Sequence, residues 1–238
     1  MPTSDLNGTK AAVLGGGTGI GEAVALALSE AGATVTVGGR RAAPLESVAA
    51  RGDSITARTV DVADRVDVAK FFDARTPDVV INCAGINIVK RSLADMDPAD
   101  FDRVLSVNTT GVYNVMHAVL PGMRQRSAGL IVNVSSIAGL RALELAGAAY
   151  CASKFAVTAL GTFAGLELAA EGVRVTNIHP GEVNTPILDQ RPVPVSAERK
   201  AAMLQPEDVA AAVLMVVNLP PRAHVPYLVI KPTVQKFA

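Results

Sequence analysis

Short continuous apolar runs alternate along the chain with longer segments in which apolar residues recur every three or four positions. An apolar run of about four to eight residues is typical of a strand buried on both faces, and the longer spacing is typical of a helix that buries one face. The predicted strands are Lys10–Leu14, Thr34–Val37, Ile55–Val60, Val79–Asn82, Leu130–Val134, Val173–Ile178 and Tyr227–Ile230.

Helical spacing fills most of the intervals between these strands. Gly32 ends the first helix, and Pro98 and Pro206 suit the first turns of two later helices, where a missing N–H is tolerated. The predicted helices are Ile20–Ala31, Pro44–Ala50, Asp64–Ala74, a short one near Leu93–Met96, a long one from Pro98 to about Arg126, Ala149–Ala170, a piece near Ser196–Leu204, and Pro206–Val217.

This alternation predicts an α/β fold with a doubly wound parallel sheet, Rossmann-like, of about seven strands with helices on both faces. No internal repeat or shift in composition divides the chain, so residues 1–238 are expected to form a single dinucleotide-binding and catalytic domain. The proline-rich stretch Pro180–Pro194 is interpreted as a functional loop, because a helix and a strand follow it.

Composition excludes several classes of protein. Half of the residues are apolar and 18% are charged, which rules out a disordered chain. Lys and Arg number 22, as do Asp and Glu, and no basic run exceeds two residues, so neither nucleic acid nor a membrane is an expected partner. Residues 1–7 lack the pattern of a signal peptide. We expect a cytoplasmic protein with Cys83 and Cys151 as reduced thiols and without a metal site.

A glycine cluster joins the first predicted strand to the first predicted helix. Its spacing lets the backbone turn tightly, approach a pyrophosphate and present N–H groups at a helix N-terminus, where anions bind well. A flexible turn without a ligand is the alternative. The candidate cofactor-binding residues here are Gly15, Gly17, Thr18, Gly19, Ile20 and Gly21.

The end of the second strand distinguishes the two nicotinamide cofactors. An acidic residue there binds the ribose 2′-hydroxyl of NAD, whereas a basic residue pairs with the 2′-phosphate of NADP. The strand ends in Gly38-Gly39 followed by Arg40 and Arg41, and arginine suits fork-like phosphate contacts. NADP(H) is therefore favoured over NAD(H), although a solvated arginine pair is also compatible with this pattern.

Two further strand ends carry candidate cofactor contacts. After the third strand, Asp61 is placed to accept a hydrogen bond from the adenine amino group, with Val62 against the ring; a helix cap or turn is an equal alternative. At the end of the fourth strand, Asn82, Ala84 and Gly85 allow a cofactor to approach the sheet edge, unless they form a plain turn.

Tyr150 and Lys154 are four residues apart in a predicted helix, so their side chains project from one face. A phenol with a pKa of ~10 is a poor acid or base at neutral pH. A nearby ammonium stabilises the phenolate and lowers that pKa. The pair is thus a candidate proton donor or acceptor near neutral pH.

In this order, the motifs resemble the short-chain dehydrogenase/reductase family in its single-domain, NADP-linked form, over essentially the whole chain. The resemblance implies an oxidoreductase that transfers a hydride between NADP(H) and a carbonyl or secondary alcohol. It rests on Gly15–Gly21, Asp61, Asn82–Gly85, Asn108, Ser135-Ser136, Tyr150-x-x-x-Lys154 and Pro180-Gly181-x-Val183-x-Thr185.

The resemblance also implies catalytic roles. Tyr150 is the general acid/base, and Lys154 lowers its pKa and binds the nicotinamide ribose. Ser136, rather than Ser135, binds the substrate oxygen, and Asn108 supports a water-linked proton relay to the lysine. A turn serine and a helix-capping asparagine are the alternatives. Further cofactor contacts over the nicotinamide are Pro180, Gly181, Val183 and Thr185.

Three features depart from the family pattern. The interval from Ser136 to Tyr150 is one residue longer than usual, and Cys83 replaces a frequent second asparagine. Thr18 stands where many NADP-preferring members carry a basic residue, which weakens the case for NADP. Family members commonly form dimers or tetramers through the two long helices, so a homodimer or homotetramer is expected.

The substrate pocket is expected between segments 139–149 and 182–204, the second of which is hypothesised to be a mobile lid. The mainly apolar character expected of the pocket fits a small carbonyl or alcohol substrate. Two alternative functions are a catalytically silent dinucleotide sensor and a nucleotide-sugar epimerase; the first should lack a catalytic residue, and the second needs a larger C-terminal domain. The expected polar residues of the pocket are Arg141, Glu144, Asp189, Arg191, Glu198, Arg199 and Lys200.

Overall fold

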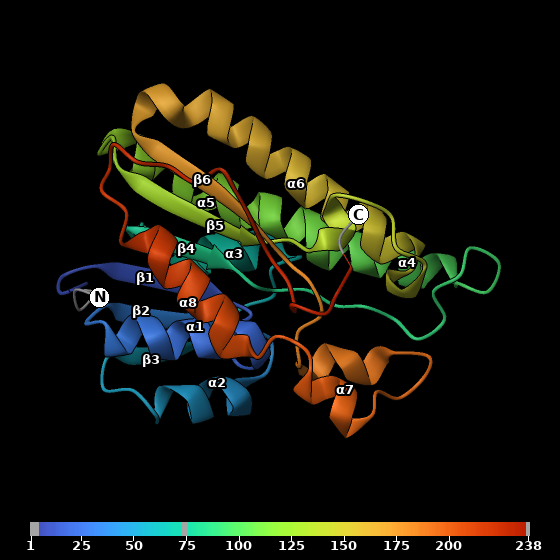
Figure 1. Cartoon of the computed structure of the whole chain (residues 1–238). Coiled ribbons are helices and arrows are strands. Elements are labelled where there is room, and N and C mark those ends of the chain that lie inside the picture. The colour runs from blue at the N-terminus through green and yellow to red at the C-terminus, as the bar shows by residue number, and fades with distance from the viewer. Residues whose placement is uncertain (1–4, 73–75, 237–238) are drawn as a thin grey trace.

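A seven-stranded, all-parallel sheet forms the centre of the molecule, with helices on both faces (Figure 1). The computed structural model describes residues 5–72 and 76–236. The spatial order of the strands is β3-β2-β1-β4-β5-β6-β7, which confirms the predicted doubly wound fold. The strands are β1 (Lys10–Leu14), β2 (Thr34–Gly39), β3 (Ile55–Thr59), β4 (Val79–Asn82), β5 (Gly129–Val134), β6 (Val173–Pro180) and β7 (Tyr227–Ile230).

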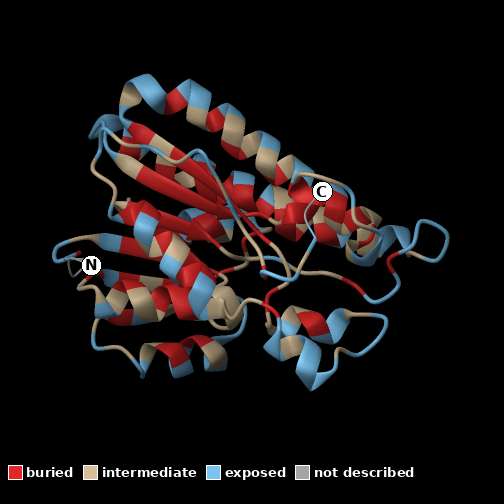
Figure 2. Cartoon of the chain, viewed as in Figure 1, coloured by how far each residue is buried: buried red, intermediate tan, exposed pale blue. Residues whose placement is uncertain are grey.

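Two apolar layers cover the sheet, one on each face. Along β1, Ala11 and Val13 point into the layer made with α1, α2 and α8, whereas Ala12 and Leu14 point into the layer made with α3, α5 and α6. Both layers are buried in the centre of the molecule (Figure 2). The helices are α1 (Gly19–Glu30), α2 (Ala42–Ala49), α3 (Arg65–Phe72), α4 (Pro98–Leu105), α5 (Gly111–Gln125), α6 (Ala148–Leu168), α7 (Ala197–Ala201) and α8 (Pro206–Val217).

The helix boundaries differ from the predictions at several points. Residues 93–95 form a turn rather than the predicted helix, because Leu93 is 83% exposed and has no apolar layer to pack against. The predicted long helix from Pro98 contains one wide turn, the π-helix Ser106–Thr110, between α4 and α5. The predicted end of the third helix at Ala74 lies outside the described residues. None of the helices in the described part of the chain is long and apolar enough to cross a membrane.

The strand order reverses between β1 and β4, and this switch point positions the site. In open α/β sheets, ligands bind beyond the carboxyl ends of the strands at such a point. Here the loop after β1 packs directly on the loop after β4, since a Cβ atom on Gly15 would lie 2.6 Å from the backbone nitrogen of Ala84.

A row of buried asparagines crosses the middle of the sheet. Asn82, Asn133 and Asn177 are register partners on β4, β5 and β6. The Asn82 amide donates to Asn133 (2.8 Å), and the Asn133 amide donates to Asn177 (3.3 Å). The Asn177 amide donates to the carbonyl of Thr158 (3.1 Å). The Asn82 side chain is therefore part of the sheet interior, contrary to the expectation that it approaches a cofactor.

Candidate active site

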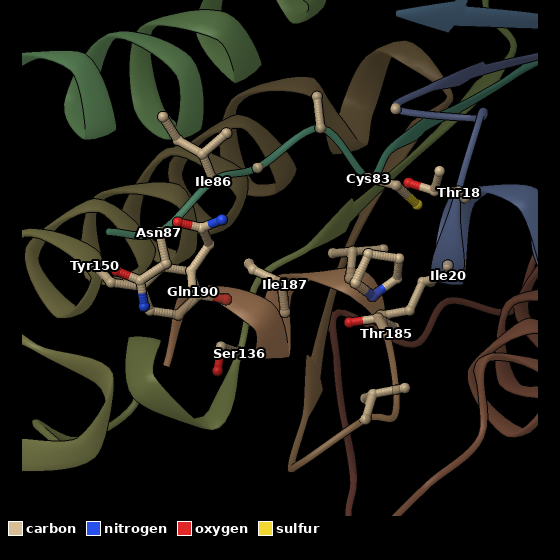
Figure 3. A pocket seen from close by; sticks show the side chains of 18 of the residues that line it. Thr18, Ile20, Cys83, Ile86, Asn87, Ser136, Tyr150, Thr185, Ile187 and Gln190 are labelled. Carbon is tan, nitrogen blue, oxygen red and sulfur yellow. The ribbon is translucent and has the colours of Figure 1, made fainter. Parts of the chain in front are cut away.

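A cavity of about 590 Å³ lies at the carboxyl edge of the sheet (Figure 3). Thr18, Ile20 and Thr185 lie at one end in this view, and Ser136 and Tyr150 lie at the other. The cavity brings together most of the site residues expected from the sequence: Gly15, Gly17, Thr18, Gly19, Ile20, Gly21, Arg40, Arg41, Asp61, Val62, Ala84, Gly85, Ser136, Tyr150, Lys154, Pro180, Gly181, Val183 and Thr185.

The glycine turn is built so that only glycine fits at its key positions. Gly15 and Gly19 have φ angles of 78° and 57°, which residues with a side chain rarely adopt. A Cβ on Gly21 would overlap the carbonyl oxygen of Gly15. Helix α1 begins directly behind this turn, so its first N–H groups are available to an anion. The turn is therefore able to hold a pyrophosphate.

The opposite wall of this end carries Arg40, Arg41, Asp61 and Val62. Both arginines are exposed. The Asp61 carboxylate accepts a hydrogen bond from the backbone of Ala63 (3.0 Å), so it forms the turn that was the alternative interpretation while still lining the cavity. Val62 is buried and also lines the cavity.

Ser135 and Ser136 point in different directions. The Ser135 hydroxyl is buried against α6, 3.1 Å from the carbonyl oxygen of Lys154. The Ser136 hydroxyl accepts a hydrogen bond from the backbone of Ala138 (3.1 Å) and is also hydrogen-bonded to Tyr150. Ser136 is therefore the serine of the pair whose hydroxyl can reach a ligand beside Tyr150.

The protonation of Tyr150 differs from the expectation. Burial raises the pKa of Tyr150 to about 12, and the hydrogen bond with Ser136 offsets only part of this effect. Burial lowers the pKa of Lys154 to about 8. The Lys154 ammonium donates to the carbonyl of Val134 (2.9 Å), and its nitrogen lies 5.6 Å from the centre of the Tyr150 ring. Burial, the Ser136 hydrogen bond and the charges of Cys151 and Arg91 account for the shift of the Tyr150 pKa, and the expected lowering by Lys154 is not among these causes.

Asn108 lies behind the cavity, inside the π-helical turn, and is fully buried. Its side chain accepts from the backbone nitrogen of Ile86 (2.8 Å) and donates to the carbonyl of Ile86 (3.0 Å) and to Ser153 (3.0 Å). A Cβ on Gly85 would lie 3.6 Å from the Asn108 amide oxygen and 3.7 Å from the Lys154 nitrogen. Asn108 therefore fixes the loop after β4 directly beside the lysine.

His179 contacts the backbone of Ser136. It is fully buried in β6, its ring stacks on Tyr227, and its Nδ1 atom lies 3.1 Å from the carbonyl oxygen of Ser136. Because a carbonyl only accepts hydrogen bonds, the proton of the neutral ring is on Nδ1. Burial lowers the pKa of His179, which keeps the ring neutral.

Two polar residues of the cavity, Asn87 and Arg91, were not expected from the sequence. A third, Gln190, lies in the expected segment 182–204 but was not named among its polar residues. Asn87 and Gln190 lie close to Tyr150 in Figure 3. The position of Asn87 and Arg91 after a strand of the switch point was an available signal. The expected pocket residue Arg191 does line the cavity; Arg141, Glu144, Asp189, Glu198, Arg199 and Lys200 do not.

The two cysteines are free thiols. Cys83 lines the cavity, and burial raises the pKa of its thiol to about 12, so it is not a nucleophile near neutral pH. No cluster of His, Cys, Asp and Glu able to hold a metal ion occurs within residues 5–72 and 76–236.

The family model for the short chain dehydrogenases matches residues 9–193. The chain belongs to this family. It is therefore an NAD(P)-dependent oxidoreductase.

A dehydrogenase and a reductase resemble the chain over most of its length. It is 35% identical over 201 residues to 2-keto-3-deoxy-L-fuconate dehydrogenase of Xanthomonas campestris, which covers 84% of this chain and 67% of that protein. It is 34% identical over 246 residues to glycine betaine reductase of Emericella nidulans. That match covers 98% of this chain but only 19% of the much longer fungal protein.

Solved short-chain dehydrogenases have the same fold. A serine dehydrogenase complexed with NADP⁺ superposes with a TM-score of 0.87 at 28% identity, covering 96% of this chain and 97% of that one. A 3-ketoacyl-(acyl-carrier-protein) reductase from Brucella melitensis complexed with NADH gives a TM-score of 0.87 at 26% identity, with coverages of 96% and 99%. Both nicotinamide cofactors thus occur among these neighbours.

Proposed function

We propose that this short-chain dehydrogenase transfers a hydride between NADP(H) and a carbonyl or secondary alcohol, with Tyr150 as general acid/base. The observation that supports the proposal is that Tyr150 and Ser136 lie at one end of a cavity that has Thr18 of the glycine turn at its other end. Lys154 lines the same cavity, with its nitrogen 5.6 Å from the centre of the Tyr150 ring. A bound nicotinamide supplies or accepts the hydride.

The residues of the cavity fit a phosphorylated dinucleotide. A Cβ on Gly15 would meet the backbone of Ala84, and one on Gly21 would meet the carbonyl of Gly15, so only glycine lets this turn form. The start of α1 favours a pyrophosphate. Arg40 and Arg41 are exposed at the rim and form no ion pair with any residue that the structure describes, so both guanidiniums are available to a 2′-phosphate. This favours NADP(H) over NAD(H).

Tyr150 is the proton donor when a carbonyl is reduced. Because its pKa is about 12, the phenol keeps its proton at neutral pH and holds it next to Ser136. The Ser136 hydroxyl donates to the substrate oxygen and stabilises the negative charge that develops there. In the reverse direction the phenol first releases its proton through the relay to solvent, and the phenolate oxygen then accepts the proton of the alcohol.

Lys154 and Asn108 support this chemistry. The Lys154 ammonium is held by Val134 at the level of the Tyr150 ring and contributes positive charge as Tyr150 loses its proton. It is also placed to bind the nicotinamide ribose. Asn108 fixes the backbone of Ile86 and supports the proton relay behind the lysine. Pro180, Gly181, Val183 and Thr185 line the cavity, and they would contact a bound nicotinamide.

We further propose that residues 1–238 work as one catalytic domain that assembles as a homodimer or homotetramer through α5 and α6. Phe155, Phe163 and Leu166 form a stripe on the outer surface of α6, 43%, 66% and 78% exposed. Tyr113 on α5 is also exposed. Large apolar stripes of this kind mark interaction surfaces. Light scattering that finds only a 24.5 kDa species would refute this assembly.

The test of the function is the oxidation of NADPH, and separately of NADH, with a panel of ketones, aldehydes and oxo acids. We expect turnover that Tyr150→Phe abolishes while its affinity for NADPH stays close to that of the wild type. Full activity of Tyr150→Phe would overturn the mechanism. Cofactor binding without turnover of any carbonyl would favour the silent dinucleotide sensor instead.

A further inference from the structure

Arg91 is a buried arginine at the substrate end of the cavity. It lies between β4 and α4 and is only 9% exposed. Its guanidinium donates to three backbone carbonyls, those of Ile88 (2.9 Å), Leu145 (2.9 Å) and Gln190. These carbonyls belong to three separate segments of the chain, so the guanidinium is fixed in one orientation.

The charge of Arg91 is not matched by a carboxylate. No Asp or Glu within the described residues forms an ion pair with it. The acidic residues that line the cavity are Asp61 and Glu182. Asp61 follows β3, away from Tyr150, and Glu182 already accepts from Arg191 (2.7 Å) and from Arg199 (3.1 Å). The substrate end of the cavity is therefore electropositive, although the whole chain has a formal net charge of zero.

Arg91 also retains hydrogen-bond donors. A guanidinium has five N–H groups, and the three contacts above use one on Nε and one on each terminal nitrogen. One N–H on each terminal nitrogen is left. Two donors from one planar group match the two oxygens of a carboxylate.

The guanidinium lies within electrostatic reach of the reacting group. The pKa of Tyr150 is raised mainly by burial and lowered by the Ser136 hydrogen bond, and the Arg91 charge also lowers it. Arg91, Tyr150, Leu145 and Ile187 line the same cavity. A substrate whose oxygen lies at Tyr150 and Ser136 therefore shares its cavity with the Arg91 guanidinium.

We propose that Arg91 selects substrates with a carboxylate close to the reacting carbonyl or hydroxyl group, that is, short oxo acids and hydroxy acids. This inference rests on the function proposed above and names its substrate class. Burying a fixed guanidinium without a carboxylate partner is costly unless a ligand provides one, so a neutral ketone leaves the site incompletely satisfied.

The experiment compares 2-oxo and 3-oxo acids of three to eight carbons with their methyl esters, using the wild-type enzyme and NADPH. We expect kcat/KM to be at least about tenfold higher for the best acid than for its ester, because one charge-assisted contact is lost in the ester. Arg91→Gln should remove this preference mainly by raising KM for the acid, and Arg91→Lys should keep part of it. Lys90→Gln is the matched control, since Lys90 is exposed, adjacent in sequence and outside the cavity.

The possible outcomes distinguish failure of the Arg91 proposal from failure of the proposed function. A wild-type enzyme that uses the ester as well as the acid would refute the carboxylate role of Arg91 and leave the proposed function intact. An Arg91→Gln variant that loses acid and ester activity equally would show that Arg91 only holds the three segments together. Failure to turn over any carbonyl of either series, with NADPH or NADH, would refute the proposed function itself.

Discussion

The Nδ1 atom of His179 lies 3.1 Å from the backbone carbonyl oxygen of Ser136, so a fully buried imidazole holds the residue whose hydroxyl bonds to Tyr150. The Nε2 atom of the ring has no hydrogen-bond partner within the described residues. The contact that the ring makes through Nδ1 positions the backbone of Ser136.

Two substitutions of His179 should distinguish the effect of its Nδ1 hydrogen bond from the effect of its ring stacking. His179→Phe keeps stacking on Tyr227 but loses the Nδ1 proton, and we expect kcat to fall roughly tenfold because the Ser136 backbone is released. His179→Asn provides a donor in a similar position and should retain more of kcat despite losing the ring. Steady-state kinetics on both variants, with unfolding curves as a control for stability, test this. A His179→Phe enzyme with unchanged kcat would contradict the positioning role.

The ionisation of Tyr150 can be followed directly, because the chain has three tyrosines and no tryptophan. Burial raises the pKa of Tyr150 to about 12, so its phenol should stay protonated through about pH 10, where an ordinary tyrosine is half ionised. Ultraviolet difference spectra of the wild type and of Tyr150→Phe, both without cofactor, should therefore coincide in phenolate absorbance up to that pH. An extra phenolate in the wild type below about pH 10 would disprove the shift.

Lys154 is expected to lower the stability of the fold at neutral pH. Its folded pKa is about 8 against an ordinary value of 10.5, so the unfolded chain binds more protons between these two values. The free energy of unfolding should then rise with pH across this window, by about 3 kcal/mol in total. Lys154→Met should abolish activity, remove this rise and be more stable at pH 7 by about 2 kcal/mol, because losing the bond to Val134 offsets part of the gain.

Urea unfolding of the wild type and of Lys154→Met at pH 7 and pH 9.5 measures both effects. Other groups that titrate in this range change the two proteins equally, so the difference between them isolates the lysine. A variant that is less stable than the wild type at both pH values would show that the ammonium contributes more through its contacts than burial costs it.

The glycine turn should not tolerate a methyl group. Gly15→Ala forces a side chain into a backbone with φ of 78° and against Ala84, and should cost about 2 kcal/mol and abolish NADPH binding. Gly165→Ala in α6 is the control, because its Cβ would make an ordinary contact of 3.7 Å and should stabilise the helix by about 0.5–1 kcal/mol. Calorimetry with NADPH and thermal unfolding would report both properties.

Arg40 and Arg41 should determine the preference between the two cofactors. Removing a guanidinium that bonds to a 2′-phosphate costs roughly 1.5–3 kcal/mol, so Arg40→Ala and Arg41→Ala should each raise KM for NADPH by about tenfold or more. KM for NADH should be nearly unchanged. Arg51→Ala removes an arginine that lies outside the cavity and should leave both constants unaltered. A wild-type enzyme that prefers NADH would refute the assignment.

Much of the fold could be predicted from the sequence because the five strands between the edge strands β3 and β7 are largely buried on both faces. The apolar runs that begin at Lys10 and Val79 match β1 and β4 residue for residue. The spacing of apolar residues predicted a helix wrongly at Leu93, where no apolar layer is available for a helix to pack against. It also gave no sign of the π-helical turn around Asn108. One extra residue in a helical turn hardly changes an apolar pattern.

The site was predictable where a motif is local and not where contacts join distant segments. The glycine turn and the Tyr150/Lys154 pair are read from spacing within a few residues. Arg91 is held by carbonyls 54 and 99 positions away in the chain, so no spacing indicates that it is buried. The pKa of Tyr150 likewise depends on burial by several elements, which is why a neighbouring lysine was given too much weight.

The asparagine row across β4, β5 and β6 favours the correct register of these strands during folding. A strand that pairs one residue out of place turns all its side chains to the other face, and a shift of two places an amide opposite an aliphatic residue. Either error buries amide groups without partners, at about 1–3 kcal/mol for each. A mispaired intermediate of the folding chain is therefore short-lived compared with the native pairing. The loops of the active site follow these strands, so their relative positions depend on the same correct register.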